Sequence, residues 1–361
     1  MNKVYYKDFS FLGKIVDKDH AVVITDEHVF AAHQKKFGDW NTIVIDAGEQ
    51  YKIQPTVDSI IEQLIAFGAD RRTFLIGVGG GVVTDLVGYV AATYMRGLPV
   101  GFAPASILAM VDASIGGKNG IDVGLYKNLV GTIRQPQFLL YDYGLLKSLP
   151  TTEWVNGFAE IIKHAAIKDA AMFRDLEKHT LAGYRKDKTA LARLIRRNVA
   201  IKSAVVEKDE FEQGDRRLLN FGHTLGHAIE NLYELPHGHA ISIGMVAACM
   251  ISEELTGFKD TDRVVAVLKK YGLPTLATFD PKEVMNLLRM DKKRVKDDMN
   301  YVLLNRIGQA VVRPIPVTQL EKLLESILAA GGGSSDRTNI NALRASRYIS
   351  GRVTRANKSA R

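Results

Sequence analysis

Apolar and polar residues alternate along the first 150 residues in a pattern that predicts buried strands separated by helices. Short runs rich in Val, Ile and Phe are bounded by Asp, Gly or Pro, as is typical of strands in a parallel sheet. Between the second and third runs, Pro55 opens a segment with helical spacing of apolar residues, and Gly68 closes it. Repeated strand, helix and strand units predict a parallel sheet covered by helices. The predicted strands are 21–25, 42–46, 73–77, 99–103 and 138–142.

After Pro150 the apolar residues recur mainly at spacings of three and four, which predicts helices. One strand pair is predicted near the end, with a turn at Gly308. The pattern therefore predicts an α/β domain over residues 1–150 and a second, mainly α-helical domain over 151–330. The predicted helices are 151–168, 187–207, 214–231, 238–256, 281–290 and 317–329, and the strand pair is 301–305 with 309–313.

Basic residues are concentrated at the end of the chain. The sequence has 48 Lys and Arg against 40 Asp and Glu, a formal net charge of +8. Seven of the basic residues and one Asp lie in 331–361, so this segment carries six of the eight net charges. It opens with Gly and Ser and has few apolar residues, so we expect a disordered basic tail. Nucleic-acid binding by this tail is the alternative, but such charges without interleaved aromatic residues are typical of a solvated tail.

The composition excludes several classes of protein. With 46% apolar and 24% charged residues, the chain resembles an ordinary globular protein. Cys249 is the only cysteine, which excludes an intrachain disulfide and a cysteine-based metal cluster. The first ten residues lack the apolar core of a secretory signal, and the apolar runs are interrupted by acids or too short to span a bilayer. We therefore expect a cytoplasmic protein.

A glycine-rich segment, GVGGGVVTD from Gly77 to Asp85, follows the third predicted strand and leads into a helix. Backbone N–H groups in such a turn can bind a pyrophosphate at the start of the helix. The spacing differs from G-x-G-x-x-G, so a turn that only packs tightly is an equal alternative. Asp26 and Glu49 follow the first two strands and could contact a nucleotide, although each taken singly fits an N-cap or a loop residue.

Four of the nine histidines lie within 17 residues, from His223 to His239. His223 and His227 are four residues apart, which places them on one face of a helix, and His237 follows a turn marked by proline. A lone helical histidine is usually structural, but this cluster indicates a metal site once a carboxylate completes it. The best-placed carboxylate is Glu160, in a predicted helix.

Several cations lie among glycines and apolar residues rather than on charged faces. Solvated lysines are the norm, but these recur close to the histidine cluster or the glycine-rich turns. Converging cations suit a small phosphorylated or carboxylated substrate. The cations and adjacent amides are Arg96, Lys118, Lys127, Asn128, Lys163, Lys202, Arg216, Asn220, Lys292 and Lys293.

Seven segments, in order, resemble the 3-dehydroquinate synthase family of sugar-phosphate cyclases. The resemblance covers about residues 20–315 and is more specific than any single motif. The segments are GGGVVTDLVGYVAATYMRG (79–97), ILAMVDASIGGKNGID (107–122), KNLVG with QP (127–136), NGFAEIIKHAAI (156–167), KDEFEQGDRRLLNFGHTLGHAIE (208–230), HGHAISIGM (237–245) and DKK (291–293).

The resemblance implies a homodimer with an NAD-binding α/β domain and a helical metal-binding domain. It implies conversion of 3-deoxy-D-arabino-heptulosonate 7-phosphate to 3-dehydroquinate and phosphate, a step of the shikimate pathway to aromatic amino acids. The implied lyase reaction comprises oxidation by NAD, phosphate elimination, reduction, ring opening and an intramolecular aldol. The implied cofactors are NAD and a divalent metal, zinc or cobalt.

The resemblance also implies a role for individual residues. The implied metal ligands are Glu160, His223 and His237, and the implied catalytic residues are Glu212, His227 and Lys163. The implied substrate contacts are Asp112, Lys118, Asn128, Lys163, Lys202, Arg216, Asn220 and one of Lys292 or Lys293, here taken as Lys293, with Arg96 reaching across the dimer. The implied nucleotide contacts are Asp26, Glu49, Lys52, Gly80, Gly81, Asp85, Ala105, Ser106 and Lys127.

Three sites differ from the family's commonest pattern. Ala105 with Ser106 replaces Thr-Thr, Asn119 replaces Thr, and His239 replaces Glu beside the implied ligand His237.

Two other enzymatic functions are alternatives. The first alternative is another sugar-phosphate cyclase, acting on glucose 6-phosphate or sedoheptulose 7-phosphate. The second is a metal-dependent polyol or glycerol-phosphate dehydrogenase, which would form NADH stoichiometrically.

Overall fold

A computed structural model describes residues 3–124, 126–277, 280–290, 294–295 and 298–330 of the chain. By their internal contacts these residues form two compact units, Met1–Glu160 with Arg185–Glu212, and Ile161–Tyr184 with the chain from Gln213 onward. The assignment of NAD binding to residues 1–150 and of metal and substrate binding to residues 151–330 stays a prediction. The basic tail, 331–361, lies outside the described residues.

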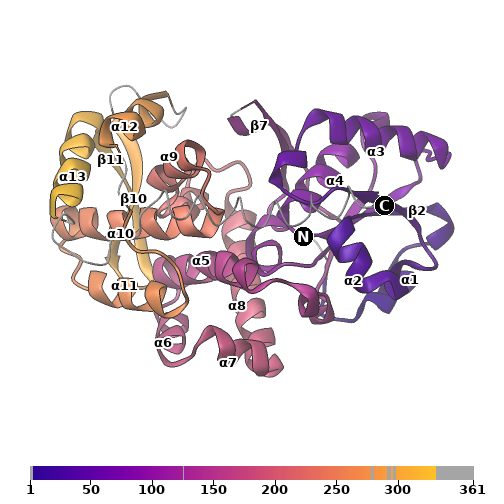
Figure 1. Ribbon diagram of the computed structural model, residues 1–361, viewed down its shortest axis with the longest axis horizontal. Coiled ribbons are helices and arrows are strands. Elements are labelled where there is room, and N and C mark those ends of the chain that lie inside the picture. Colours follow the sequence, from indigo (N-terminus) through magenta and orange to yellow (C-terminus); the bar gives the residue numbers. More distant parts are fainter. Residues whose placement is uncertain (1–2, 125, 278–279, 291–293, 296–297, 331–361) are drawn as a thin grey trace, which may run out of the picture. The chain divides into compact units, whose positions relative to one another are not determined.

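The first unit is built around a six-stranded sheet in which every pair of neighbouring strands is parallel. The strand order is β1-β8-β5-β4-β2-β3. Figure 1 shows α3 and α4 on one face and α1 and α2 on the other. The strands are β1 (Lys3–Tyr5), β2 (Ala21–Asp26), β3 (Asn41–Ile45), β4 (Phe74–Gly79), β5 (Val100–Pro104) and β8 (Phe138–Leu140), and the helices are α1 (Leu12–Ile15), α2 (Glu27–Phe37), α3 (Gln54–Ala66) and α4 (Gly81–Thr93).

A two-stranded antiparallel hairpin, absent from the sequence prediction, follows the fifth strand of the chain. It consists of β6 (Lys118–Val123) and β7 (Tyr126–Ile133), and a π-helical turn at Ala109–Ala113 precedes it. The middle of β6 is buried, whereas β7 exposes most of its residues, including Tyr126, Leu129 and Ile133. The first unit also contains α8 (Lys188–Lys208).

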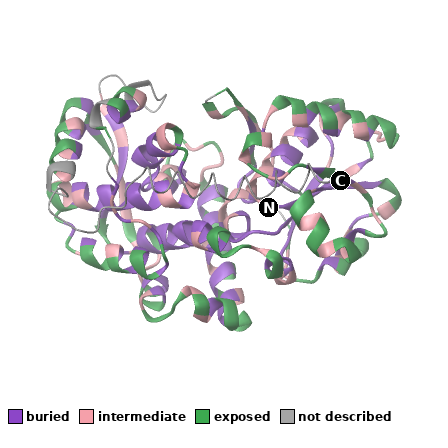
Figure 2. Ribbon diagram, in the orientation of Figure 1, coloured by how far each residue is buried: buried purple, intermediate pink, exposed green. Residues whose placement is uncertain are grey.

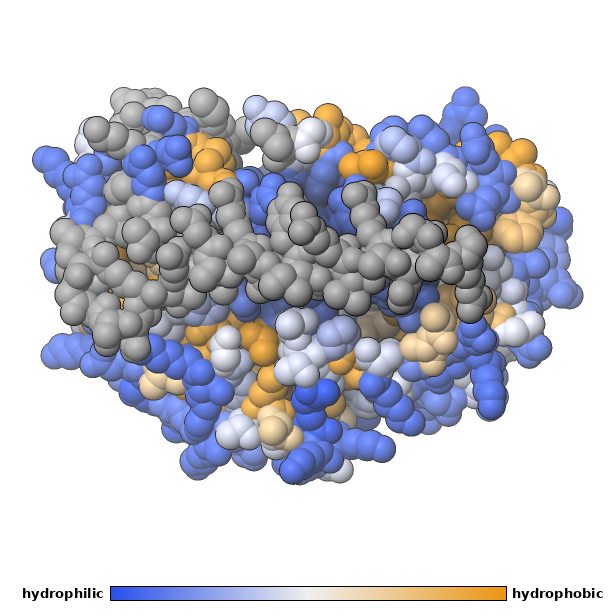
Figure 3. All heavy atoms as spheres, viewed as in Figure 1, coloured by the Kyte–Doolittle hydropathy of each residue, from blue (hydrophilic) through white to orange (hydrophobic). Residues whose placement is uncertain are grey.

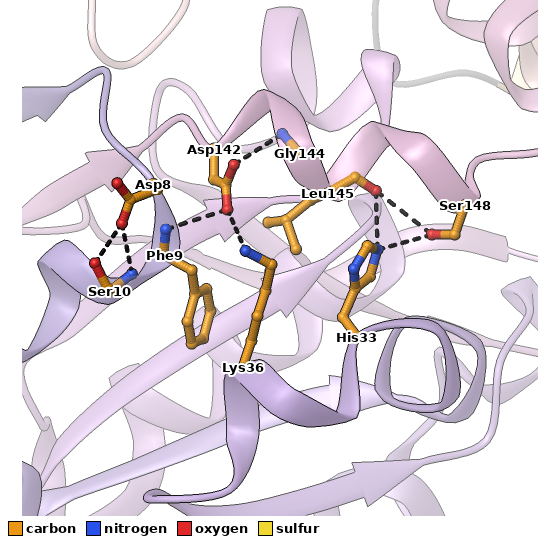
Figure 4. A network of polar contacts seen from close by, with 9 residues as sticks. All are labelled: Asp8, Phe9, Ser10, His33, Lys36, Asp142, Gly144, Leu145 and Ser148. Atoms are coloured by element: carbon orange, nitrogen blue, oxygen red, sulfur yellow. Dashed lines mark hydrogen bonds and ion pairs between the residues drawn. The ribbon is translucent and has the colours of Figure 1, made fainter.

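Asp142 joins three separate segments of the first unit (Figure 4). Its carboxylate accepts hydrogen bonds from Phe9 N at 3.1 Å, Gly144 N at 2.8 Å and Lys36 Nζ at 2.8 Å. On the same face His33 Nε2 lies 2.9 Å from Ser148 Oγ. The side chain of Asp142 is 7% exposed, so these donors compensate the cost of removing its charge from water. The contacts hold the chain before α1 and helix α2 against the segment that follows β8.

The second unit is mainly helical, with a small antiparallel sheet of order β11-β10-β9. Its central helix is α10, which is buried along most of its length (Figure 2) and packs against α9 and β10. Helix α5 (Thr151–Lys168) runs from the first unit into the second, and α7 (Leu181–Lys186) also includes the boundary. The other elements are α6 (Ala170–Lys178), α9 (His223–Tyr233), α10 (His237–Thr256), α11 (Thr261–Lys270), α12 (Pro281–Met290), α13 (Val317–Ala330), β9 (Arg294–Val295), β10 (Asp298–Arg306) and β11 (Gln309–Pro316).

The predicted fold class, a parallel α/β part followed by a mainly helical part, is confirmed. One predicted helix, 214–231, is interrupted: a 3-10 helix covers Asp215–Asn220, and α9 begins only at His223. The physical cause is Gly222, whose φ of 77° lies in the left-handed region. The break turns the chain just before the histidine cluster.

No helix among the described residues is long and apolar enough to cross a membrane. On the face seen in Figure 3, hydrophobic side chains form small groups separated by hydrophilic ones.

Candidate functional site

The strand order of the first unit predicts where a ligand binds. From β2 the chain passes to β3 at one edge, then crosses back so that β4 lies on the other side of β2. In open α/β sheets, ligands bind at the carboxyl ends of the strands at such a reversal. Asp26 ends β2, and Gly79 ends β4. The sheet therefore places Asp26 beside the glycine-rich turn, two features that were predicted separately from the sequence.

The glycine-rich turn is the first wall of this candidate site. Gly80 is the N-cap of α4 and has no side chain to cap the first-turn N–H groups, which point out of the helix end. The Ser106 side chain lies 3.6 Å from the position that a Cβ on Gly80 would take, and Ala105 N donates to Gly79 O at 2.7 Å. The uncapped helix start and the absence of side chains fit a pyrophosphate.

Asp26 has a structural role at the same edge. Its carboxylate accepts from His28 N at 3.0 Å and Val29 N at 2.9 Å and so caps α2. This is the N-cap role that the sequence left open for Asp26.

Lys52 is the centre of a polar cluster at the start of α4. Its ammonium lies 2.6 Å from Asp85 Oδ2, 2.5 Å from Asn128 Oδ1 and 3.9 Å from Glu49 Oε1, and the side chain is 5% exposed. Burial by itself lowers the pKa of Lys52, but the attraction of the Asp85 and Glu49 carboxylates outweighs it and holds the pKa above its ordinary value. Lys52 therefore stays charged and connects α4 to β7, which carries Asn128 and Lys127.

Two further ion pairs in the first unit join residues predicted to bind substrate or, for Glu212, to transfer protons. Lys202 on α8 lies 2.7 Å from Asp112 Oδ1 and donates to Asp112 O at 2.7 Å. Lys118, at the start of β6, contacts the carboxylate of Glu212, whose φ of 59° is in the left-handed region. Both pairs bring together residues far apart in sequence.

Glycines set the distance between α9 and α10, the two helices that carry the histidines. A Cβ on Gly244 would lie 1.9 Å from Gly222 O, and a Cβ on Gly222 would lie 2.6 Å from Met245 Cγ. The backbones therefore approach more closely than any side chain at these positions permits. The start of α9 therefore lies against the middle of α10, and the ring centroids of His223 and His237 are 5.6 Å apart.

Glu160, His223 and His237 form a group whose donor atoms all lie within 4.8 Å of one another. Glu160 lies on α5, the continuous helix in which the first unit ends and the second begins, and its side chain is buried. His223 Nδ1 lies 3.1 Å from Phe221 O, which can only accept a hydrogen bond, so Nδ1 carries the proton and Nε2 keeps a lone pair. One carboxylate and two neutral imidazoles are a donor set suited to zinc or cobalt.

His227 lies beside this group. Its ring centroid is 5.1 Å from that of His223 and 6.2 Å from that of His237. A second possible donor group consists of His227, Glu230 and His237.

The remaining predicted residues have varied environments. Lys163 on α5 and Arg216 are buried, with 1% and 3% exposure, whereas Asn220 is partly buried. Arg96 is exposed in a turn where its φ is 66°. Lys292 and Lys293 lie outside the described residues.

Two residues in these clusters were not predicted from the sequence. Glu230 Oε2 lies 3.1 Å from His237 Nδ1, and Asp122 Oδ1 accepts from Asn128 N at 2.7 Å. Glu230 could have been selected because it is three and seven residues after His227 and His223, on the same helix face. Asp122 had no such signal, since the hairpin itself was not predicted.

Comparisons with known protein families agree over most of the chain. The family model for the N-terminal part of 3-dehydroquinate synthase matches residues 42–156, and the model for the C-terminal part matches 157–294. A 3-dehydroquinate synthase of Pyrococcus abyssi is 41% identical over 340 residues, which is 91% of this chain and 100% of the relative. One from Geotalea uraniireducens is 39% identical over 78% of this chain and 80% of its own length.

Solved structures show the same fold. A 2-epi-5-epi-valiolone synthase from Streptomyces hygroscopicus subsp. jinggangensis, with NAD+ and Zn2+ bound, has a TM-score of 0.82 at 29% identity, covering 91% of this chain and 97% of that one. A 2-deoxy-scyllo-inosose synthase complexed with carbaglucose-6-phosphate, NAD+ and Co2+ has a TM-score of 0.78 at 25% identity, covering 90% and 96%. With both halves matched by family models and a relative 41% identical along its whole length, this chain belongs to the 3-dehydroquinate synthase family.

Proposed function

We infer that this protein converts 3-deoxy-D-arabino-heptulosonate 7-phosphate to 3-dehydroquinate and inorganic phosphate, as an NAD- and metal-dependent lyase. Relatives about 40% identical over most of the chain have this function in their names. The structural observation that carries the proposal is the donor group of Glu160, His223 and His237, in which Glu160 and His223 are buried and His237 is partly buried. A divalent metal held by these residues would polarise an alcohol and then a ketone, which suits a lyase that oxidises its substrate transiently.

We propose Glu160, His223 and His237 as the ligands of a zinc or cobalt ion. Their donor atoms are close enough to share one ion, and the hydrogen bond from His223 Nδ1 leaves Nε2 available. When bound, the metal supplies Lewis acidity at the hydroxyl that is oxidised and at the resulting ketone. The proposed ligands fall within residues 151–330, the segment predicted as the metal- and substrate-binding domain.

We propose that NAD binds at the carboxyl ends of β2 and β4, within the predicted NAD-binding domain of residues 1–150. NAD supplies reversible hydride transfer at the carbon-5 alcohol of the substrate. Gly80 and Gly81 offer uncapped N–H groups to the pyrophosphate, and Lys52 adds a charge beside them. The further proposed contacts are Asp26, Glu49, Asp85, Ala105, Ser106 and Lys127.

Cations bind the two anionic groups of the substrate in this proposal. Lys163 and Arg216 are buried, so their charges require anionic or hydrogen-bonding partners. The low dielectric constant of a buried site also strengthens their attraction for an anionic ligand. Lys202 and Lys118 are held in place by Asp112 and Glu212. Asn128, Asn220, Arg96 and Lys293 complete the proposed set.

Proton transfer is assigned to Glu212, His227 and Lys163. The Glu212 carboxylate contacts Lys118, which places a cation beside this proposed proton acceptor. His227 presents an imidazole beside the proposed ligand His223 and could hold or release a proton there. These assignments rest on the family resemblance and on the positions of the side chains.

A homodimer is proposed on the same resemblance, with Arg96 reaching the partner's site. The exposed position of Arg96 and the exposed apolar residues of β7 support an interface in this region. The molar mass in solution, measured by light scattering, tests the dimer. The proposed location is the cytoplasm.

The activity is tested by incubating the purified protein with the heptulosonate phosphate, NAD and Zn2+ and measuring phosphate and 3-dehydroquinate. Folded, metal-loaded protein that releases no phosphate would refute the proposal. Glucose 6-phosphate and sedoheptulose 7-phosphate are the comparison substrates, because the similar structures include other cyclases. Stoichiometric NADH formation would instead indicate a dehydrogenase.

A further inference from the structure

Glu230 is a buried carboxylate that no assigned role explains. It lies on α9, two turns after His223, and its side chain is 7% exposed. Its Oε2 atom is 3.1 Å from Nδ1 of His237, the first residue of α10. Both residues belong to the second unit, and the contact joins the end of α9 to the start of α10.

The contact determines which nitrogen of His237 can bind a metal. An ionised carboxylate only accepts hydrogen bonds, so Nδ1 of His237 is the donor and carries the proton. Nε2 then keeps its lone pair, as it does in His223, where Nδ1 faces Phe221 O. The two histidines therefore have the same tautomer, set by a carboxylate in one and a backbone carbonyl in the other.

We propose that Glu230 is a positioning residue of the metal centre: it fixes the tautomer and ring orientation of His237 and increases the electron density at Nε2. The inference rests on the proposed metal site of Glu160, His223 and His237. Partners of this kind strengthen metal binding without touching the ion, and their removal typically weakens affinity by about 10-fold to 100-fold.

Direct ligation by Glu230 is the competing role, because His227, Glu230 and His237 also form a donor group. The two ring nitrogens of an imidazole point in diverging directions. A carboxylate that accepts the Nδ1 proton therefore lies on the far side of the ring from an ion on Nε2. The observed 3.1 Å contact favours the positioning role.

The experiment measures Co2+ affinity of the full-length protein by chelator competition, together with the visible absorption spectrum of the bound Co2+. The variants are Glu230→Gln, which keeps an acceptor of the same size without the charge, and Glu230→Ala, which removes it. We expect the dissociation constant to rise about 10-fold for Gln and about 100-fold for Ala. We also expect a spectrum that shows an unchanged number of ligands.

Two controls separate this role from a structural one. Ser252→Ala removes a buried hydroxyl on α10 that accepts from Leu304 N at 3.0 Å, and it should lower stability without changing Co2+ affinity. His223→Ala removes a proposed ligand and should abolish tight binding. Circular dichroism establishes that each variant is folded, and the near-isosteric Glu230→Gln serves if Glu230→Ala does not fold.

The outcomes are distinct. Affinity within about twofold of wild type in the folded Glu230 variants would overturn the proposal. Loss of binding in Glu230→Gln as complete as in His223→Ala, or residual binding with a spectrum that shows fewer ligands, would show that Glu230 is a direct ligand. Wild-type protein that fails to bind Co2+ would refute the metal site itself, and with it the proposed function.

Discussion

Replacing Gly244 by Ala should separate α9 from α10 and disturb the histidine cluster. The added Cβ would lie 1.9 Å from Gly222 O and 2.9 Å from Gly226 N, both backbone atoms of the segment that begins α9. Backbone atoms cannot rotate away as a flexible side chain can. The helices must therefore move apart, and His223 follows Gly222 directly.

The size of the movement follows from the contact distance. Real Cβ contacts essentially never fall below 3.0 Å, so the gap must widen by at least the difference between 3.0 and 1.9 Å, which is 1.1 Å. Metal–ligand distances tolerate only about 0.2 Å, so we expect Co2+ affinity to fall at least about 10-fold, or ~1.4 kcal/mol. Overpacking of this kind costs about 1–3 kcal/mol of unfolding free energy.

Urea unfolding of the apoprotein and Co2+ competition measure the two effects separately. Gly38→Ala is a matched control because nothing lies within 4 Å of its added Cβ and its φ of −55° suits alanine. It should change the unfolding free energy by less than about 1 kcal/mol and leave Co2+ affinity unchanged. Wild-type affinity and stability in Gly244→Ala would show that close helix approach does not set the histidine separation.

Three other changes test the remaining features. Lys52→Met leaves the Asp85 carboxylate without its buried counter-ion and should cost about 3 kcal/mol in urea unfolding. Because the pKa of Lys52 is raised, the stability that its charge adds is fully present below about pH 10 and is lost only as the pH rises above that value. Burial lowers the pKa of His33. Below about pH 6.5 this histidine therefore binds fewer protons in the folded state than in the unfolded chain, and the free energy of unfolding falls as the pH falls. His33→Gln should make the slope of unfolding free energy against pH between 7 and 5 shallower, and an unchanged slope would exclude His33 as its source. EDTA should lower the melting temperature of the Zn2+-loaded protein, since a ligand at 100 times its dissociation constant adds about 2.7 kcal/mol. His223→Ala should melt at the same temperature with and without EDTA, and a chelator effect in this variant would point to a different metal site.

The parts of the fold that could be predicted from sequence are those set by local periodicity. Helices 151–168 and 281–290 were predicted with the observed bounds because their apolar residues repeat without interruption. The helix predicted over 214–231 is broken at Gly222, whose left-handed φ interrupts it and whose close contact with α10 leaves no room for a side chain. The β6–β7 hairpin escaped prediction because its apolar residues do not alternate between a buried and an exposed face.

The candidate site was predictable to a similar extent. Histidine spacing indicated the cluster from His223 to His239, since residues on one helix or beside one turn are neighbours by local geometry, whereas the choice of His223 and His237 as ligands came from the family resemblance. The contact of Lys52 with Asn128 spans 76 residues and depends on the unpredicted hairpin, so no local pattern could indicate it. Tertiary packing, rather than propensity, assembles the polar clusters of the first unit.

The position of β1 has a consequence for folding during synthesis. Lys3–Tyr5 pairs with Phe138–Leu140, so β1 leaves the ribosome while its partner lies 135 residues later in the chain. At about 5–20 residues per second, some 7–27 s pass between the synthesis of the two strands. The nascent chain can assemble β2, β3, β4 and β5 in that interval. Because β8 lies between β5 and β1, β1 can join the sheet only after β8 has paired with β5 or together with β8. β1 therefore joins the sheet as one of the last steps, and until then the free edge of β8 is open to pairing with other chains.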